Sequence, residues 1–347
     1  MGVNPIAGTG VFLLGGVAAA LYLLPFRAVK GWSYERGWLL SVIAGWLVFP
    51  LVFDWFVVPD VFAVLRSDGC ATLARTVGFG ALWGVGALAW ALMVRYLGVG
   101  LGLAIGAGLC AAAGTLLPPI VTGNAVSLVA TRGACVVLGG VLLSLVGIAL
   151  VGAAGKFKEG EMDEAAKKKA VAEYDFRKGV VTAVVAGVAS AGINFGLQGA
   201  PAWEKVALDQ GASPLWAGMP VLTATLWGGV LTQVLWVTYK AFTTRGATQN
   251  PRAQAPSLLP NLALCVLSGV MGVSQFVLQK LGEPLMGEMR YISFAVLMAS
   301  AIFFSTAVGL FLGEWRQTGR RTRFCLASGI GILLLAFIVI SLGGRPD

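Results

Sequence analysis

Long segments of apolar residues recur from one end of this 347-residue chain to the other. A helix needs about 20 consecutive apolar residues to cross the hydrocarbon core of a bilayer, which is about 30 Å thick. Lipid offers no hydrogen-bond partner to backbone N–H and C=O groups, so each such segment must be helical. Ten segments are long enough: 6–26, 37–58, 76–94, 98–120, 134–154, 179–199, 214–238, 258–279, 291–312 and 324–342. The sequence therefore predicts an all-α integral membrane protein with ten transmembrane helices.

The composition leaves no room for a soluble domain. Only 12% of the residues are charged, whereas a typical soluble domain has about 25%. The connections between the apolar segments are short and cannot form a separate core. We therefore expect the chain to work inside the lipid bilayer.

One charged stretch, residues 156–178, interrupts this pattern near the middle of the chain. Five apolar segments precede it and five follow. We predict a first five-helix repeat over 1–155, a charged cytoplasmic linker over 156–178 and a second five-helix repeat over 179–347. Because each repeat has an odd number of crossings, the second enters the membrane in the opposite sense to the first. Inverted repeats of this kind place a substrate site between them, near the bilayer midplane.

The positive charges predict the orientation of the chain. The net charge is +9, but the cations lie at the ends of apolar segments, so no nucleic-acid partner is expected. Most of the 25 lysine and arginine residues follow odd-numbered segments, with a cluster in the linker. The positive-inside rule places these connections in the cytoplasm. The chain is thus predicted to be a multi-pass protein of the bacterial cytoplasmic (inner) membrane with both termini in the periplasm.

The residues that hold metals and cofactors are scarce. The chain has no histidine, and its five cysteines are scattered without a CxxC pair. A metal, haem or disulfide framework is therefore not expected, nor is any cofactor. The chain is predicted not to be an enzyme and to have no catalytic residues. A membrane-embedded enzyme acting on lipid-linked sugars is the alternative, and it would need a carboxylate or histidine cluster beside a sizeable loop.

Neutral polar and aromatic side chains gather inside several segments. Asn194 and Gln198 lie four residues apart on one helix face, and Trp227 follows Thr223 at the same spacing. Amides can bond the hydroxyls of a neutral sugar, and flat rings can cover its C–H surface. The alternative is that the amides bond neighbouring helices and the tryptophans form an interfacial belt. The candidates for a sugar site are Trp83, Trp90, Asn194, Gln198, Gln233, Gln275 and Ser293.

Three carboxylates are candidates for proton coupling: Asp54, Glu283 and Glu288. Asp54 lies well inside an apolar segment, where acidic residues are costly and usually functional. It is also close enough to the helix end to reach the outer surface, which is the alternative for this residue. Glu283 and Glu288 lie in the connection before segment 291–312, where solvated loop carboxylates are the alternative. Transport without proton coupling also remains open.

Several different short motifs follow one another along the chain. The first is the run Pro25-Phe26-Arg27-Ala28-Val29-Lys30-Gly31-Trp32-Ser33-Tyr34-Glu35 at the end of the first segment. Further motifs are Trp83-Gly84, Arg95-Tyr96-Leu97-Gly98, Gly114-Thr115-Leu116, Ser190-Ala191-Gly192, Gly228-Gly229, Gln275-Phe276, Tyr291-Ile292-Ser293 and Gly313-Glu314-Trp315. Together, nearly end to end, this ordered set resembles the bacterial L-rhamnose–proton symporter family, a ten-helix branch of the drug/metabolite transporter superfamily.

The resemblance implies a secondary active transporter that imports L-rhamnose or a related deoxy-sugar with protons by alternating access. Its expected partners are a small neutral sugar, protons and the lipid bilayer. A monomer is expected, with a dimer as the alternative. The chain departs from the family pattern in residues 282–290 and 87–90, which bears on the substrate more than on the fold. The alternative function is a permease or exporter of another small metabolite, uncoupled or coupled to another ion.

Overall fold

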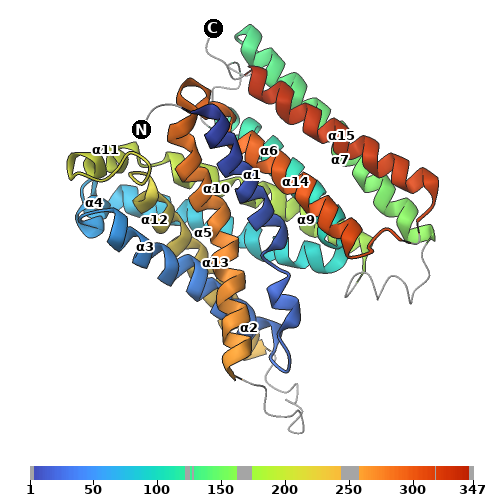
Figure 1. Cartoon of the computed structure of the whole chain (residues 1–347), viewed down its shortest axis with the longest axis horizontal. Helices are drawn as coiled ribbons and strands as arrows, with labels where there is room; N and C mark the ends of the chain where they lie inside the picture. The colour runs from blue at the N-terminus through green and yellow to red at the C-terminus, as the bar shows by residue number, and fades with distance from the viewer. Residues whose placement is uncertain are drawn as a thin grey trace. The chain divides into compact units, whose positions relative to one another are not determined.

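A computed structural model describes residues 4–121, 126, 129–161, 174–243, 258–316 and 318–343. Within these ranges every regular element is a helix (Figure 1). The elements of the N-terminal half are α1 (Pro5–Leu21), η1 (Pro25–Ala28), α2 (Tyr34–Val42), η2 (Ile43–Val48), α3 (Phe49–Val57), α4 (Val61–Arg66), α5 (Gly69–Leu97), α6 (Val99–Val121) and α7 (Arg132–Glu161). Those of the C-terminal half are α9 (Phe176–Ser190), α10 (Gly192–Gln198), α11 (Pro201–Asp209), α12 (Met219–Thr243), α13 (Leu258–Gly282), η4 (Glu283–Ile292), α14 (Ser293–Phe311) and α15 (Arg320–Gly343).

Helical segments of membrane-spanning length dominate the described chain. Eight are long and apolar enough to cross a bilayer: Pro5–Ala28, Glu35–Val57, Gly69–Leu97, Arg132–Lys158, Phe176–Asp209, Met219–Lys240, Leu258–Gly287 and Arg320–Ile340. Large apolar side chains on these and neighbouring helices are exposed, for example Phe56 and Phe311 at 80% and 87%. Water penalises such exposure, whereas lipid does not. The chain is an α-helical integral membrane protein, as the composition predicts.

The second predicted segment, 37–58, is helical but not uniformly α-helical. A π-helical turn, η2, separates α2 from α3, and Pro50 lies in the first turn of α3. Proline lacks the N–H that an α-helix would bond to the carbonyl four residues earlier, so a local widening before it relieves the conflict. Pro220 lies inside the predicted segment 214–238 but does not interrupt a helix there. Helix α12 begins at Met219, so Pro220 occupies the first turn, where no intrahelical N–H bond is needed.

Two short helices, α4 and α11, are absent from the sequence-based prediction. Asp60 caps α4 by accepting a hydrogen bond from the Ala63 N–H at 2.9 Å, and Pro201 starts α11. Both helices are too short to cross a bilayer, so a search for long apolar segments does not detect them. They pack together around the fully buried Trp203.

The chain forms two compact units, and each draws on both halves of the sequence. Unit 1 comprises Met1–Ala20, Gly86–Gly192 and Leu281–Asp347. Unit 2 comprises Leu21–Val85 and Ile193–Lys280.

In unit 1, α7 and α15 lie side by side along their length (Figure 1). The two helices run antiparallel, because Gly140 faces Ile340 whereas Gly147, further along α7, faces Leu333. Small residues at these positions allow the two backbones to approach closely. The Glu161 carboxylate, at the end of α7, accepts hydrogen bonds from the Gly319 N–H at 2.6 Å and the Thr322 hydroxyl at 2.8 Å. These bonds lower the pKa of Glu161 below its ordinary value of 4.5.

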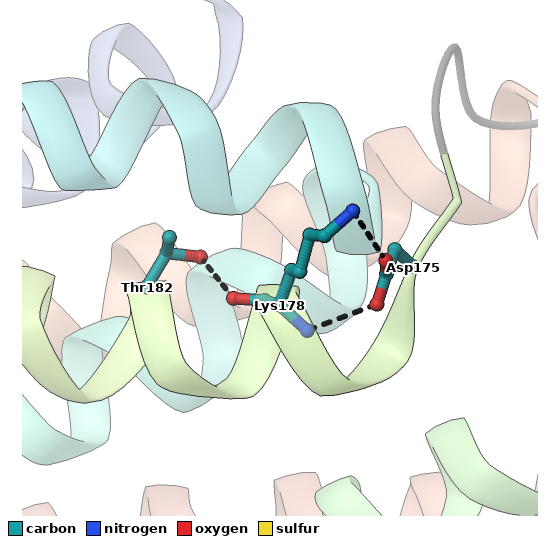
Figure 2. Close-up of polar contacts among 3 residues, drawn as sticks. All are labelled: Asp175, Lys178 and Thr182. Atoms are coloured by element: carbon teal, nitrogen blue, oxygen red, sulfur yellow. Dashed lines mark hydrogen bonds and ion pairs between the residues drawn. The ribbon is translucent and has the colours of Figure 1, made fainter.

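Helix α9 of unit 1 begins with a side-chain cap (Figure 2). The Asp175 carboxylate accepts from the Lys178 backbone N–H at 2.9 Å, and the Lys178 ammonium lies 3.1 Å from the other carboxylate oxygen. The Thr182 hydroxyl continues the chain of contacts by donating to the Lys178 carbonyl. The backbone bond holds the pKa of Asp175 below its ordinary value. The cap therefore sets the start of α9 at Phe176, inside the charged stretch 156–178.

In unit 2, α12 is the central helix and packs against α2, η2, α3, α4 and α11. It also crosses α5 at very close range, because Gly80 faces the Thr225 carbonyl and Gly228 faces the backbone of Val77 and Ala81. A side chain at either glycine would collide with main-chain atoms of the other helix. This crossing brings the polar residues of α12 next to α3 and α5.

Candidate functional site in unit 2

A buried carboxyl group forms the polar centre of unit 2. Asp54 of α3 is 0% exposed, and its Oδ2 accepts a hydrogen bond of 2.7 Å from the hydroxyl of Thr223 on α12. Its other oxygen, Oδ1, is also buried and has no hydrogen-bond partner. Asp54 therefore points into the protein and not toward the outer surface, which was the alternative for this residue. The free oxygen can accept a proton or a hydrogen bond from a ligand.

The local sequence places this carboxyl group. Pro50 starts α3 after the π-helical turn, and Asp54 follows it by one turn of helix. Thr223 lies on α12, one turn after Met219, which is the first residue of that helix. Threonine can also bond within its own helix, yet here its hydroxyl donates across to α3. The pair thus joins two helices from opposite halves of the chain.

Aromatic rings form a continuous cluster in the same unit. Trp46 lies at the centre, with its ring centroid 4.5 Å from that of Trp83 and 6.2 Å from that of Trp38. Phe276 of α13 meets Trp83 edge to face at 5.5 Å. We call these four residues, Trp38, Trp46, Trp83 and Phe276, the aromatic cluster. Flat rings of this kind pack against the C–H faces of sugars as well as against one another.

Gln233 connects the aromatic cluster to two helices. Its Oε1 accepts from the Trp38 Nε1–H at 2.7 Å, and its Nε2 donates to the Gly84 carbonyl at 2.7 Å. The side chain is 0% exposed. Both ends of this amide already have protein partners, so Gln233 positions Trp38 and α5 within unit 2.

Three more of the sequence-predicted sugar-site residues lie in unit 2. Gln275 precedes Phe276 on α13, is half-buried and donates to the Gly272 carbonyl of its own helix at 2.9 Å. Asn194 is half-buried on α10, next to Phe195, whose ring stacks on that of Phe79. Gln198 belongs to the last turn of α10, but its side chain lies outside the described part of the structure.

The remaining candidates belong to unit 1. Trp90 is half-buried, and its ring lies against Gly106 of α6. Ser293 begins α14, is 2% exposed, and its hydroxyl has no hydrogen-bond partner. Glu283 is 9% exposed at the start of η4. The side chain of Glu288 is not among those described.

Sequence reasoning missed Trp38, Trp46 and Phe276 as members of the aromatic cluster. Trp38 and Trp46 are eight residues apart, close to two helical turns, which is a detectable signal for one shared face. The π-helical turn between them and the contact with α13 cannot be read from such spacing. Among the described residues, no group of three or more cysteine, aspartate or glutamate side chains is arranged to hold a metal ion.

Comparison with known proteins gives a match along almost the entire chain. The family described as L-rhamnose-proton symport protein (RhaT) matches residues 2–345. A protein of Cronobacter sakazakii named L-rhamnose-proton symporter is 33% identical over 338 residues, covering 95% of both chains. A protein of the same name from Klebsiella pneumoniae subsp. pneumoniae is 32% identical over 350 residues, covering 98% of this chain and 99% of its own.

A third relative of that name, from Shigella sonnei, is 31% identical over 339 residues, covering 96% of this chain and 97% of its own. No solved structure matches the chain. The family match covers all the motifs on which the resemblance rests. The chain belongs to the L-rhamnose-proton symport protein family.

Proposed function

We propose that this protein imports L-rhamnose, or a related deoxy-sugar, together with protons by alternating access. The observation that carries the proposal is the match of residues 2–345 to the L-rhamnose-proton symport protein family. Relatives that bear the name L-rhamnose-proton symporter cover at least 95% of the chain. The buried carboxyl group of Asp54 and the neutral, aromatic surroundings of unit 2 suit a proton and an uncharged sugar.

The proposed architecture has ten transmembrane helices in two inverted five-helix repeats, 1–155 and 179–347, joined by the cytoplasmic linker 156–178. Two further helices support the count beyond the eight long apolar segments. These are α6, with 23 residues, and α14, with 19 residues. We place the protein in the bacterial inner membrane as a monomer with both termini in the periplasm, because the positive charges favour that orientation.

The proposed sugar site is built from Trp83, Trp90, Asn194, Gln198, Gln233, Gln275 and Ser293. Trp83 supplies a buried ring within the aromatic cluster, and Gln233 holds that cluster in place. Ser293 offers a buried hydroxyl with no protein partner. A polar group left unpaired in the interior costs free energy unless a ligand or water satisfies it.

Asp54 is the proposed carrier of the coupling proton, with Glu283 and Glu288 as the other candidates. A carboxyl group inside a membrane span that gains and loses a proton during the cycle moves one positive charge with the sugar. Asp54 is favoured because it is fully buried in a span and one of its oxygens is free of protein partners.

The test of this function is uptake of labelled L-rhamnose by proteoliposomes that contain the purified full-length protein. With an inward proton gradient, we expect accumulation above the external concentration, and a protonophore should abolish it. Equal uptake with and without the gradient would identify an uncoupled permease instead. No uptake of L-rhamnose, with incorporation of the protein verified, would refute the proposal.

The variant Asp54→Asn tests the proton carrier. Asparagine keeps the size of the side chain and can still accept from Thr223, but it cannot release a proton. We expect loss of gradient-driven accumulation, while exchange of labelled for unlabelled sugar across the membrane continues. The matched control is Asp209→Asn, the same change at an exposed residue at the end of α11 in unit 2. Accumulation by the Asp54→Asn protein at the unmodified rate would exclude Asp54 and leave Glu283 and Glu288.

A further inference from the structure

We infer that Asp54 and Trp227 together bind a single hydroxyl group of the transported sugar, which donates to Asp54 Oδ1 and accepts from Trp227 Nε1. This inference rests on the proposed function and names a substrate contact that the proposed sugar site does not include. It follows from two buried polar atoms that have no partner within the protein.

The first atom is the free oxygen of Asp54. Thr223 occupies Oδ2 at 2.7 Å, so the carboxyl group is held in one orientation. Oδ1 is buried without a hydrogen-bond partner. A buried carboxylate oxygen is a strong acceptor, and leaving it unpaired is unfavourable. A ligand that donates a hydrogen bond there would remove that cost.

The second atom is the indole nitrogen of Trp227. Nε1–H can only donate, and it too is buried without a hydrogen-bond partner. Trp227 follows Thr223 by four residues on α12, so the two side chains share one face and their Cβ atoms lie about 5–6 Å apart. The hydroxyl that fixes Asp54 and the unpaired indole are therefore neighbours on the same helix face.

Packing against one buried cluster also relates Trp227 to α3. Trp227 packs against the buried cluster that contains Val58, and Val57 packs against that cluster as well. Val57 follows Asp54 by three residues, so the two share one face of α3. The face of α3 that carries the carboxyl group and the ring of Trp227 thus both adjoin the same cluster.

The chemistry of the two atoms selects the ligand group. A metal or ammonium ion would satisfy Asp54 and leave the indole N–H unpaired, whereas an anion would do the reverse. A hydroxyl group donates one hydrogen bond and accepts another, so one sugar hydroxyl satisfies both atoms. The sugar would then contact the same carboxyl group that we propose carries the proton. In the proton-loaded state the proton lies on Oδ2 and is donated to the Thr223 hydroxyl oxygen, so Oδ1 stays an acceptor for the sugar and the two transported species share one group.

The experiment compares binding of L-rhamnose and of its single-deoxy analogues to the purified full-length protein by titration calorimetry. The variant Trp227→Phe removes the N–H and keeps an aromatic ring. We expect it to weaken L-rhamnose binding by roughly tenfold or more, since a buried partner is lost. We also expect one deoxy analogue, the one that lacks the bound hydroxyl, to bind Trp227→Phe and the unmodified protein equally well.

Trp203→Phe is the matched control, because Trp203 has an unpaired buried Nε1 in the same cluster but lies on α11. Its affinities should stay within about twofold of those of the unmodified protein, which is a smaller change than the loss of a buried hydrogen bond would cause. If Trp227→Phe does not fold, Asp54→Asn alters the other partner of the same hydroxyl. It should reduce the ratio of the affinity for L-rhamnose to the affinity for the same deoxy analogue.

Two results would overturn the inference, and they are distinguishable. If the unmodified protein binds L-rhamnose but Trp227→Phe keeps all the affinity ratios, the two atoms are bridged by water only and the proposed function stands. If the unmodified protein neither binds nor transports L-rhamnose, the proposed function fails and the inference fails with it.

Discussion

At the scale of single residues, hydrogen-bond partners distinguish Gln233 from Asp54 and Trp227. Gln233 has protein partners at both ends of its amide, whereas Asp54 Oδ1 and Trp227 Nε1 have none. Most buried polar groups in proteins are paired, so an unpaired acceptor and an unpaired donor mark places that a ligand or water can occupy. Residue type alone does not show this difference, because all three side chains are polar residues in apolar helices.

The paired state of Gln233 leads to a stability prediction. Replacing it in the variant Gln233→Leu removes both hydrogen bonds and deprives the Trp38 indole of its acceptor. We expect the free energy of unfolding to fall by about 1–3 kcal/mol. Thermal unfolding in detergent, followed by tryptophan fluorescence, measures the change.

Gln275→Leu is the control for that measurement. Gln275 is half-buried, and the bond that the described residues give it runs to the Gly272 carbonyl of its own helix, so its loss should cost less. Equal destabilisation by the two variants would show that Gln233 does not tie its neighbours together.

At the scale of helices, close packing at glycine decides where α5 and α12 cross. Gly80 faces the Thr225 carbonyl, and Gly228 faces main-chain atoms of α5. In lipid there is little hydrophobic force between helices, so such close van der Waals contact supplies much of their association. The crossing also sets the position of the α12 face that carries Thr223 and Trp227.

Two glycines on α5 provide a matched test of this crossing. Gly80→Ala should destabilise the protein by about 1–3 kcal/mol, because the new methyl group collides with the α12 backbone. Gly78→Ala, two residues earlier, meets nothing within 4 Å and should stabilise the helix by up to about 1 kcal/mol. Thermal unfolding of both variants in one detergent gives the comparison. The same sign of change for both would contradict the close crossing.

At the scale of the whole molecule, the compact units do not follow the order of the chain. Each unit takes helices from both sides of the central charged stretch. The contact between Asp54 and Thr223 shows why, since its two residues are 169 positions apart in the sequence. Interleaving of this kind is compatible with the two inverted repeats that we propose, each of which would contribute helices to both units.

The proposed orientation can be tested with a native cysteine. Cys70 is exposed at the start of α5, in the connection that the charge distribution places in the periplasm. A membrane-impermeant maleimide should therefore label it in right-side-out vesicles and not in sealed inside-out vesicles. The Cys70→Ser variant identifies the labelled position. Labelling only from the cytoplasmic side would reverse the predicted topology.

The membrane-spanning character of the chain was predictable from the sequence because insertion depends on local composition. About 20 apolar residues suffice to make a helix the stable state in lipid, whatever the rest of the fold does. Each of the eight long apolar helices overlaps a predicted segment, including the one that contains the π-helical turn. The family was predictable too, because ordered motifs such as the one at 25–35 can be recognised in the sequence without knowledge of the fold.

The tertiary structure alone decided which polar side chains are paired. Asp54 was predictable as an unusual acid in a span, but its partner Thr223 comes from the other half of the chain. The aromatic cluster likewise needs Phe276 of α13 and a π-helical turn between Trp38 and Trp46. The local sequence determines which segments cross the membrane, because the stability of each helix in lipid depends on the composition of that segment. Hydrogen bonds between distant segments depend on how the helices pack, so only the folded chain leaves Asp54 Oδ1 and Trp227 Nε1 unpaired.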